Sequence, residues 1–393
     1  MRCRPYCIVE GVGFRHLADK FIEIGAKYGK IPAKEILPVA TTVSRHLSDM
    51  YMAKKGLLKL LAQDVPSFGV TCDGWTHEST NVSYITVTVH YVSSDWKLAN
   101  AIIATRQLNE SHTADCIRST VMEILSEFDF QKHGNVYVTD NASNMKAAFG
   151  AYTWIGCSGH NLNLVLSHGL QLAGSSGLPN EIGTLINTCK QLVTLMKRTK
   201  LNNQLETTLK QCVVTRWNSI LTMLNSLSLN LVDLRQLTAS GKGNQNLMRL
   251  LADVDEQLLH DVTEVLKPLD SATKLLSADH RPTIHQVVAV QHKLRCQIAA
   301  IPTDTVVIQS FKAHMTTQLD KYFTVTDFHR VALLLDPRLK LNTTIISAEE
   351  RARAINFLEK MVDEKVVSKL VTTTNVTDMA TEAPPLKKVK VGL

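Results

Sequence analysis

The chain has 393 residues, of which 45% are hydrophobic and 20% charged, and its formal net charge is +7. This length exceeds one compact core, so we expect two or more domains. The composition excludes a membrane-spanning protein, because no apolar run reaches the roughly 18 residues that a span needs. The N-terminus also lacks the pattern of a secretory signal, which predicts reduced cysteines in an intracellular compartment. The positive charge favours an anionic partner without identifying it.

Residues 1–67 are expected to form a helical N-terminal segment. Apolar residues recur at helical spacing in FRHLADKFIEIGAKY and again in VSRHLSDMYMAKKGLLKLLAQ. Pro66 then ends the pattern.

From Phe68 the apolar pattern changes to a period of two, which is typical of strands. It is clearest in VSYITVTVHYV, where Ile85, Val87 and Val89 share one face with Tyr91. Further strands are predicted at FGVTCD, KLANAIIATRQL, NVYVTD and YTWIGC, with helices near 113–128, 141–149 and 159–170. The order β-β-β-α-β-α-β-α predicts an α/β core over residues 68–178.

The second half of the chain is expected to be mainly helical. Residues 179–345 carry helical periodicity, and TVVIQSF at 305–311 is the one candidate strand. A C-terminal helix is predicted over 346–370. The Thr-rich, Pro-containing end at 371–393 is predicted to be a disordered tail.

Two aspartates follow strands that a mixed sheet could place side by side. Asp73 ends the first predicted strand and Asp140 ends the fourth. If these strands are neighbours, the carboxylates meet at one edge of the sheet, and such a pair often holds Mg²⁺. Two-metal phosphoryl transfer uses a clamp of this kind. The alternative is that Asp73 caps a turn before Gly74 and that Asp140 N-caps a helix beginning at Asn141.

Cys157 and His160 form a Cys-x₂-His pair, which could supply two of the four ligands of a zinc site. No second half is nearby in the sequence, so we expect no structural zinc. The alternative is a buried thiol and a hydrogen-bonded residue at a helix start.

Two short basic clusters are further candidates. KRTK at 197–200 could follow a phosphate backbone or could be an ordinary exposed helix face. PPLKKVKV, with Lys387, Lys388 and Lys390, resembles a nuclear import signal, and the alternative is a solvated tail with chance lysines.

Several blocks of sequence together resemble one protein family. FGVTCDGWT, YVTDNASNMKAAF, CSGHNLNLVL, TRWNS and LLLDPRLK stand in the order of the motif blocks of hAT-superfamily transposases and of the BED-type zinc-finger proteins derived from them. The opening CRPYCIVEGVGFRHL resembles the segment before their catalytic domain. The resemblance covers residues 1–345 and implies an α/β fold: an RNase H-like mixed sheet with a large all-α insertion and a helical N-terminal segment.

The resemblance also implies functional residues. In these enzymes two aspartates and a glutamate bind divalent metal and cleave DNA, and Asp73 and Asp140 match the two aspartates, with Mg²⁺ or Mn²⁺ as the implied cofactor. Cys157 and His160 would lie beside this site and support it.

Arg216 and Trp217 match an Arg-Trp pair of the family. There the arginine can hold phosphate, and the tryptophan is implied to stack on a flipped base. The alternative is that Trp217 anchors a helix of the insertion to the core.

The chain departs from the family in two places. The family's glutamate lies in a C-terminal dimerisation region that this sequence does not reach; Glu349 and Glu350 in SAEERARAI imitate its motif but follow LLLDPRLK too directly. No BED finger precedes Asp73.

We therefore expect a truncated, transposase-derived nuclear protein that associates with DNA, lacks full transposition activity and does not readily form a homodimer. A metal-dependent nuclease or transposase and a protein-interaction scaffold remain the alternatives.

Overall fold

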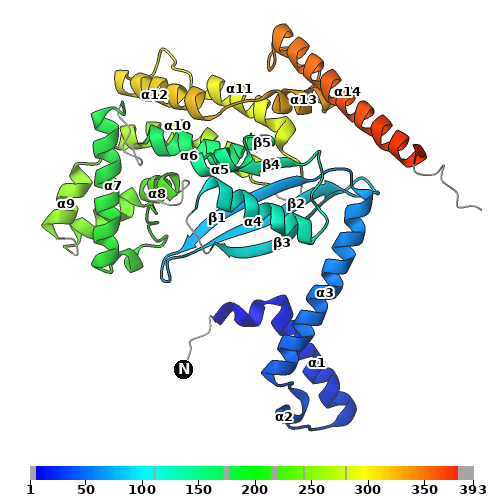
Figure 1. Cartoon of the computed structure of the whole chain (residues 1–393). Helices are drawn as coiled ribbons and strands as arrows, with labels where there is room; N and C mark the ends of the chain where they lie inside the picture. The colour runs from blue at the N-terminus through cyan, green and yellow to red at the C-terminus, as the bar shows by residue number, and fades with distance from the viewer. Residues whose placement is uncertain are drawn as a thin grey trace, which may run out of the picture. The chain divides into compact units, whose positions relative to one another are not determined.

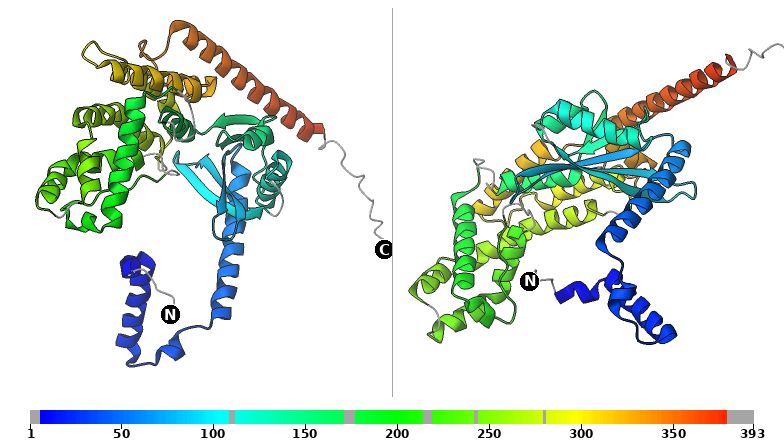
Figure 2. Two further views of the ribbon diagram at one scale, coloured as in Figure 1. Left: turned by 90° about the vertical axis from the view of Figure 1, so that its left-hand side faces the viewer. Right: turned by 60° about the horizontal axis from the view of Figure 1, so that its bottom comes forward.

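A computed structural model describes residues 6–108, 112–170, 177–213, 219–241, 244–278 and 281–378 (Figures 1 and 2). The chain divides into two compact units, Met1–Pro66 with Glu123–Lys132, and Ser67–Met122 with His133–Leu393. Within the described ranges, none of the helices combines the length and apolar character needed to cross a membrane.

The first unit is helical, as predicted. It contains η1 (Tyr6–Glu10), α1 (Val12–Tyr28), α2 (Ala33–Ile36), α3 (Ala40–Asp64) and the end of α4 (Ala114–Glu127). Lys55 on α3 pairs with Glu127 at 3.4 Å and lies 4.7 Å from the centre of the Phe128 ring. Helix α1 has no buried residue and α3 has one, Ala62. The buried apolar side chains of this unit are therefore concentrated in its second segment, at Ile124, Leu125, Phe128 and Phe130.

The second unit contains a five-stranded mixed sheet with the order β3-β2-β1-β4-β5. Its strands are β1 (Gly69–His77), β2 (Val82–Val92), β3 (Leu98–Leu108), β4 (Val136–Thr139) and β5 (Thr153–Gly156). The first three are antiparallel, and β4 and β5 run parallel to β1 and to each other. The first strand neighbours the fourth, which is the condition under which Asp73 and Asp140 were expected to meet. The arrangement is an RNase H-like α/β core, as predicted.

Alternation along the strands buries one face of the sheet. Ile85, Val87 and Val89 are fully buried, whereas Thr86 and Thr88 are half-buried on the other face. On the buried side, the Tyr137 hydroxyl of β4 lies 3.7 Å from the sulfur of Met122 in α4. Figure 1 shows α4 lying along this sheet.

The rest of the second unit is helical, as predicted. Between β4 and β5 lies α5 (Ser143–Phe149), and β5 leads into α6 (Ser158–Gly169). The later helices are α7 (Asn180–Arg198), η2 (Leu201–Gln204), α8 (Ser219–Ala239), α9 (Gln245–Ala252), α10 (Glu256–Leu276), η3 (Ile284–Gln286), α11 (Val287–Gln297), α12 (Val306–Tyr322), α13 (Asp327–Leu335) and α14 (Ala348–Asp378).

One apolar core joins the helices from α6 to α12. Leu162, Leu192, Leu224, Leu266 and Phe311, from five different helices, belong to it and are nearly inaccessible to solvent. Helix α6 thus connects the sheet edge to the helical half.

The prediction of a strand at TVVIQSF is wrong, because these residues form the N-cap and first turns of α12. Its Val-Val-Ile run is typical of strands, but the Thr305 hydroxyl accepts the Ile308 N–H at 3.3 Å and caps a helix. Ile308, Phe311 and Met315 are then buried at helical spacing. Tertiary packing therefore overrides the local β propensity.

Helix α14 is longer than predicted. It continues to Asp378, into the segment that the sequence assigned to a disordered tail. The remaining residues, with Lys387, Lys388 and Lys390, lie outside the described ranges.

Candidate active site

The register of the sheet brings the two predicted aspartates to the same level. Strands β1 and β4 pair in parallel at Gly69–Val136, Val70–Tyr137 and Thr71–Val138. Asp73 and Asp140 each come two residues after the last of these pairs. Both carboxylates therefore lie just beyond the β1–β4 ladder.

Asp73 lies in the middle of β1, which corrects the prediction that it ends the strand. After Thr71, β1 no longer pairs with β4, but it stays paired with β2 as far as His77, and Asp73 lies opposite Thr86. The alternative of a turn cap before Gly74 is also wrong, because the backbone there is extended and hydrogen-bonded to β2.

Asp140 follows β4 directly and organises the next turn. Its Oδ1 accepts the N–H of Ala142 at 3.0 Å, while α5 begins at Ser143 with Ala142 as the N-cap residue. The predicted cap of a helix beginning at Asn141 is therefore replaced by an Asx-type turn. The turn engages one oxygen, and in the described part of the chain Oδ2 accepts no hydrogen bond.

The charges of Asp140 and His160 act on the pKa of Asp73 in opposite directions. Burial raises the pKa of Asp73 above its ordinary value, and the negative charge of Asp140 raises this pKa further. His160, in the first turn of α6, acts in the opposite direction and lowers the pKa of Asp73. The three groups therefore form one site, in which like charges meet at a half-exposed edge of the sheet.

Replacing Asp73 by asparagine should stabilise the metal-free protein at neutral pH. Because its pKa is raised in the folded state, the carboxyl favours folding below its unfolded-state pKa, and this contribution is lost as pH rises through the folded pKa. Asparagine resembles the protonated form at every pH. Thermal unfolding in EDTA should give Asp73→Asn a higher midpoint than wild type at pH 7, and the gap should shrink on acidification. Asp95→Asn is the control, because the pKa of Asp95 is lowered by Lys97 and Ser93. An equal rise of the thermal midpoint in this control would contradict repulsion between Asp73 and Asp140 as the cause.

Backbone and amide contacts fix the loop that carries Asp140. The N–H of Cys157, at the start of α6, donates to the carbonyl oxygen of Thr139 at 2.8 Å. The Asn141 side-chain amide donates to Oδ1 of Asn161, which is 1% exposed on α6. A Cβ atom at Gly156 would lie 2.6 Å from the Asn141 Oδ1, so a larger residue there would displace the Asn141 side chain. This network joins β4, β5 and α6 around Asp140.

Three residues of the site were not predicted from the sequence: Asn141, Asn161 and Gly156. Gly156 at the end of a predicted strand was a usable signal, because glycine there often marks close backbone approach. The pairing of Asn141 with Asn161 depends on tertiary structure and left no sequence signal.

The Cys157–His160 pair does not gather a third metal ligand. Within the described residues, no group of three His, Cys, Asp or Glu side chains is arranged to hold an ion. Cys157 is half-buried at the N-cap of α6, and His160 faces the charge of Asp73.

Glu350 has a structural role at the start of α14. Its N–H donates to the Ser347 hydroxyl and its Oε2 accepts the Ser347 N–H, both at 3.2 Å, which is a capping box. Its Oε1 accepts from Arg330 at 3.1 Å. The resemblance of SAEER to the family's glutamate motif is thus explained by helix capping, and Glu349 beside it is exposed.

Trp75 lies on the same face of β1 as Asp73, two residues further on. Its side chain is 43% exposed and stacks on Tyr84, with ring centres 4.6 Å apart. The i, i+2 spacing from Asp73 could have identified it from the sequence. Arg216 and Trp217, the predicted nucleic-acid pair, lie outside the described residues.

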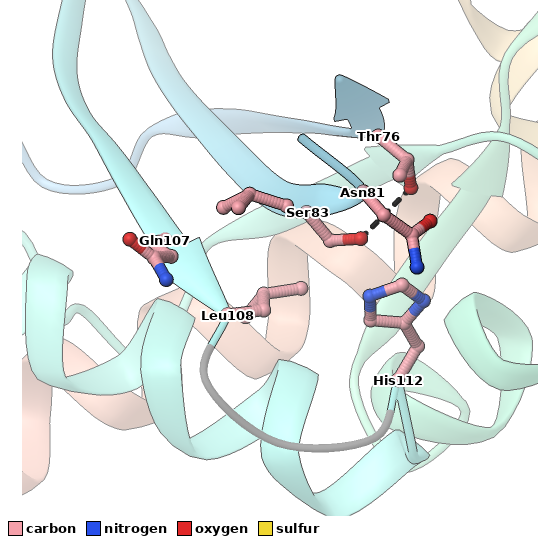
Figure 3. Close-up of a pocket in the computed structure, with 7 residues that line it drawn as sticks. Thr76, Asn81, Ser83, Gln107, Leu108 and His112 are labelled. Atoms are coloured by element: carbon pink, nitrogen blue, oxygen red, sulfur yellow. Dashed lines mark hydrogen bonds between the residues drawn. The ribbon is translucent and has the colours of Figure 1, made fainter. Parts of the chain in front are cut away.

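A hollow of about 420 Å³ lies at the C-terminal ends of β1 and β3 and the N-terminal end of β2 (Figure 3). It is lined by Thr76, Asn81, Val82, Ser83, Gln107, Leu108 and His112. The hydroxyls of Thr76 and Ser83 bond to each other at 2.8 Å. Thr76 is three residues from Asp73 and therefore points to the opposite face of β1. The hollow is separate from the aspartate pair.

Comparisons with known proteins match two parts of the chain to described domains. Residues 71–152 match the ZBED1 RNase-like domain, and residues 1–42 match the Hermes transposase DNA-binding domain. The first match contains both Asp73 and Asp140.

Longer stretches align with whole proteins. The Hobo transposase of Drosophila melanogaster is 29% identical over 288 residues, which are 72% of this chain and 42% of the transposase. Zinc finger protein 618 of Homo sapiens is 25% identical over 340 residues, 85% of this chain and 34% of that protein. An AC transposase of Zea mays is 26% identical over 335 residues, 76% of this chain and 40% of the transposase. The chain spans less than half the length of each of these relatives.

Proposed function

The chain is related to the hAT-superfamily transposases, and on this premise we propose that it is a transposase-derived nuclear protein that associates with DNA or chromatin without full transposition activity. The observation that carries the proposal is the aspartate pair. Asp73 and Asp140 lie at one level of the sheet, and the described residues place no third carboxylate with them.

DNA association is supported by the N-terminal match to a transposase DNA-binding domain. Nuclear localisation is supported by the DNA-binding and zinc-finger relatives. Trp75 adds an exposed aromatic face beside Asp73, which suits stacking with an unpaired base.

The donor set at the site suits one hard cation. Mg²⁺ and Mn²⁺ prefer oxygen ligands, and Mg²⁺ is commonly held by one or two carboxylates together with water and phosphate oxygens. Asp73 and the free oxygen of Asp140 would hold it, and when bound it would neutralise their charge and polarise a phosphate. A two-metal site needs further carboxylate ligands, which is why we propose DNA association rather than efficient cleavage.

Adding Mn²⁺ should stabilise the wild-type protein against thermal unfolding, because an ion that binds the folded state shifts the equilibrium toward it. Asp73→Asn and Asp140→Asn should each abolish the shift in midpoint, whereas Asp95→Asn should keep it. The same proteins should retain duplex DNA in a gel-shift assay.

Nicking of supercoiled DNA in the same samples separates the alternatives. Retention without nicking supports the proposal. Nicking that both aspartate variants abolish would instead establish a working nuclease. Absence of both DNA retention and the Mn²⁺ shift would favour a protein-interaction scaffold.

A further inference from the structure

Positive charge is concentrated in one stretch of the helical half. Residues 182–232 contain six basic residues and one acidic residue, Glu206, for a net charge of +5 within a chain of net charge +7. The next stretch, residues 233–279, contains five basic and eight acidic residues. The excess charge of the chain is therefore localised and not dispersed.

The structure gathers most of these charges at α7 and the segment after it. Lys190, Thr194 and Lys197 share one face of α7, at spacings of four and three residues. The Gln211 side-chain amide donates to the Thr194 hydroxyl at 3.3 Å, so the segment carrying Lys210 lies against this face. We call Lys190, Lys197, Arg198, Lys200 and Lys210 the α7 basic surface.

Among the described residues, these cations have no acidic partners. In the described part of the chain, none of the five forms an ion pair with a carboxylate, and four of them are exposed. Lys267 and Lys274 on α10, by contrast, pair with Glu264 and Asp270. The α7 basic surface therefore presents uncompensated charge to solvent.

Apart from Glu181 in the first turn, the exposed polar residues of α7 that lie among these cations are uncharged. They carry amide and hydroxyl groups: Thr184, Asn187, Gln191 and Thr194. Lysine and arginine interspersed with such groups are the side chains that contact phosphate oxygens of DNA.

Lys200 occupies a backbone position that favours glycine. It follows Thr199, the C-cap of α7, and has a φ of 61°, in the left-handed region where a Cβ atom is disfavoured. A lysine here brings charge to the surface at some loss of fold stability, which points to a role for that charge in binding.

We infer that the α7 basic surface binds the sugar-phosphate backbone of duplex DNA without reading its sequence. The inference rests on the DNA association proposed above but assigns it to a second surface, apart from both the aspartate pair and residues 1–42. Release of counterions from the phosphates would supply the affinity, which makes binding sensitive to salt.

The test compares two triple variants of the full chain with the same change in net charge. Lys197→Gln/Arg198→Gln/Lys200→Gln removes charge from the surface. Lys267→Gln/Lys274→Gln/Arg295→Gln removes three cations that are paired with carboxylates. Binding of a fluorescent duplex of arbitrary sequence is measured by anisotropy from 50 to 200 mM NaCl.

We expect the surface variant to bind at least about tenfold more weakly at low salt, with a plot of log K against log salt that is shallower by about 2 to 3, because each lost phosphate contact removes about 0.9. The control variant should bind like wild type. Equal losses in both variants, or none in the surface variant, would overturn the inference while leaving the proposed DNA association intact. Failure of the wild-type chain to bind DNA would instead refute the proposed function.

A single variant separates binding from folding. Lys200→Gly should raise the thermal midpoint, because glycine fits the left-handed backbone, and should make the salt slope shallower by about 0.9. A raised midpoint with unchanged DNA binding would show that the Lys200 charge has no part in the surface.

Discussion

Gly156→Ala should destabilise the protein by about 3 kcal/mol and weaken the Mn²⁺ response of the aspartate pair. The new Cβ atom would lie 2.6 Å from the Asn141 Oδ1 and 3.4 Å from a ring carbon of Trp154. Overpacking of this kind costs about 1–3 kcal/mol, and loss of a buried hydrogen bond adds about 1–3 kcal/mol. Asn141 cannot move away freely, because its amide is bonded to the buried Asn161. A shift of the Asn141 backbone would displace Asp140, its neighbour in the chain.

Urea unfolding measures the change in stability, and the Mn²⁺-induced shift in thermal midpoint measures the change at the site. Gly183→Ala is the matched control, because its Cβ would meet Leu178 at an ordinary 3.9 Å within α7. Removing a glycine from a helix interior should stabilise by roughly 0.5–1 kcal/mol. A Gly156→Ala protein as stable as wild type would contradict the close packing around Asn141.

Lowering the pH from 7.5 to 5 should remove about 2 kcal/mol of stability through His329 alone. This side chain is 2% exposed, and its Nδ1 accepts the N–H of Thr326 at 3.0 Å at the start of α13. Burial, aided by the charge of Arg330, lowers the pKa of His329 to about 4. A depressed pKa means that the contribution is present above the unfolded-state pKa, near 6.5, and is lost as pH falls toward 4.

His329→Gln isolates this contribution, because the glutamine oxygen can accept the same N–H and does not titrate. The difference in free energy of unfolding between wild type and His329→Gln should fall by about 2 kcal/mol from pH 7.5 to pH 5. Parallel pH curves for the two proteins would contradict the lowered pKa. Carboxylates that titrate in both proteins cancel in this difference.

Periodicity was sufficient to predict the strands and the order of the core. VSYITVTVHYV became β2 without a change of bounds, because alternate burial on a sheet leaves a direct pattern in the sequence. The meeting of Asp73 and Asp140 was expected only on the condition that the first and fourth strands are neighbours, and the pairing of β1 with β4 meets that condition.

What the sequence could not predict depends on contacts between distant residues. β1 runs past Asp73 because β2 stays paired with it after β4 has ended, and the pattern of FGVTCDGWT does not show which neighbour continues. Likewise, the effect of His160 on Asp73 arises from the direction in which α6 leaves β5. The Val-Val-Ile run of α12 has the local propensity of a strand, but burial of Ile308, Phe311 and Met315 at helical spacing stabilises a helix instead.

The unequal pairing of β1 divides the sheet at the aspartate pair. β1 is bonded to β2 along nine residue pairs but to β4 along three, so Asp73 belongs to the β1–β2–β3 meander and Asp140 to the β4–β5 half. The two aspartates therefore lie on different halves of the sheet, just beyond the point where the pairing of β1 with β4 ends. The Asp140 charge raises the pKa of Asp73, so a cation bound by both carboxylates would relieve this repulsion and link the two halves of the sheet. Hydrogen exchange at the Cys72 and Asp73 amides would then report whether a bound cation links the two halves of the sheet.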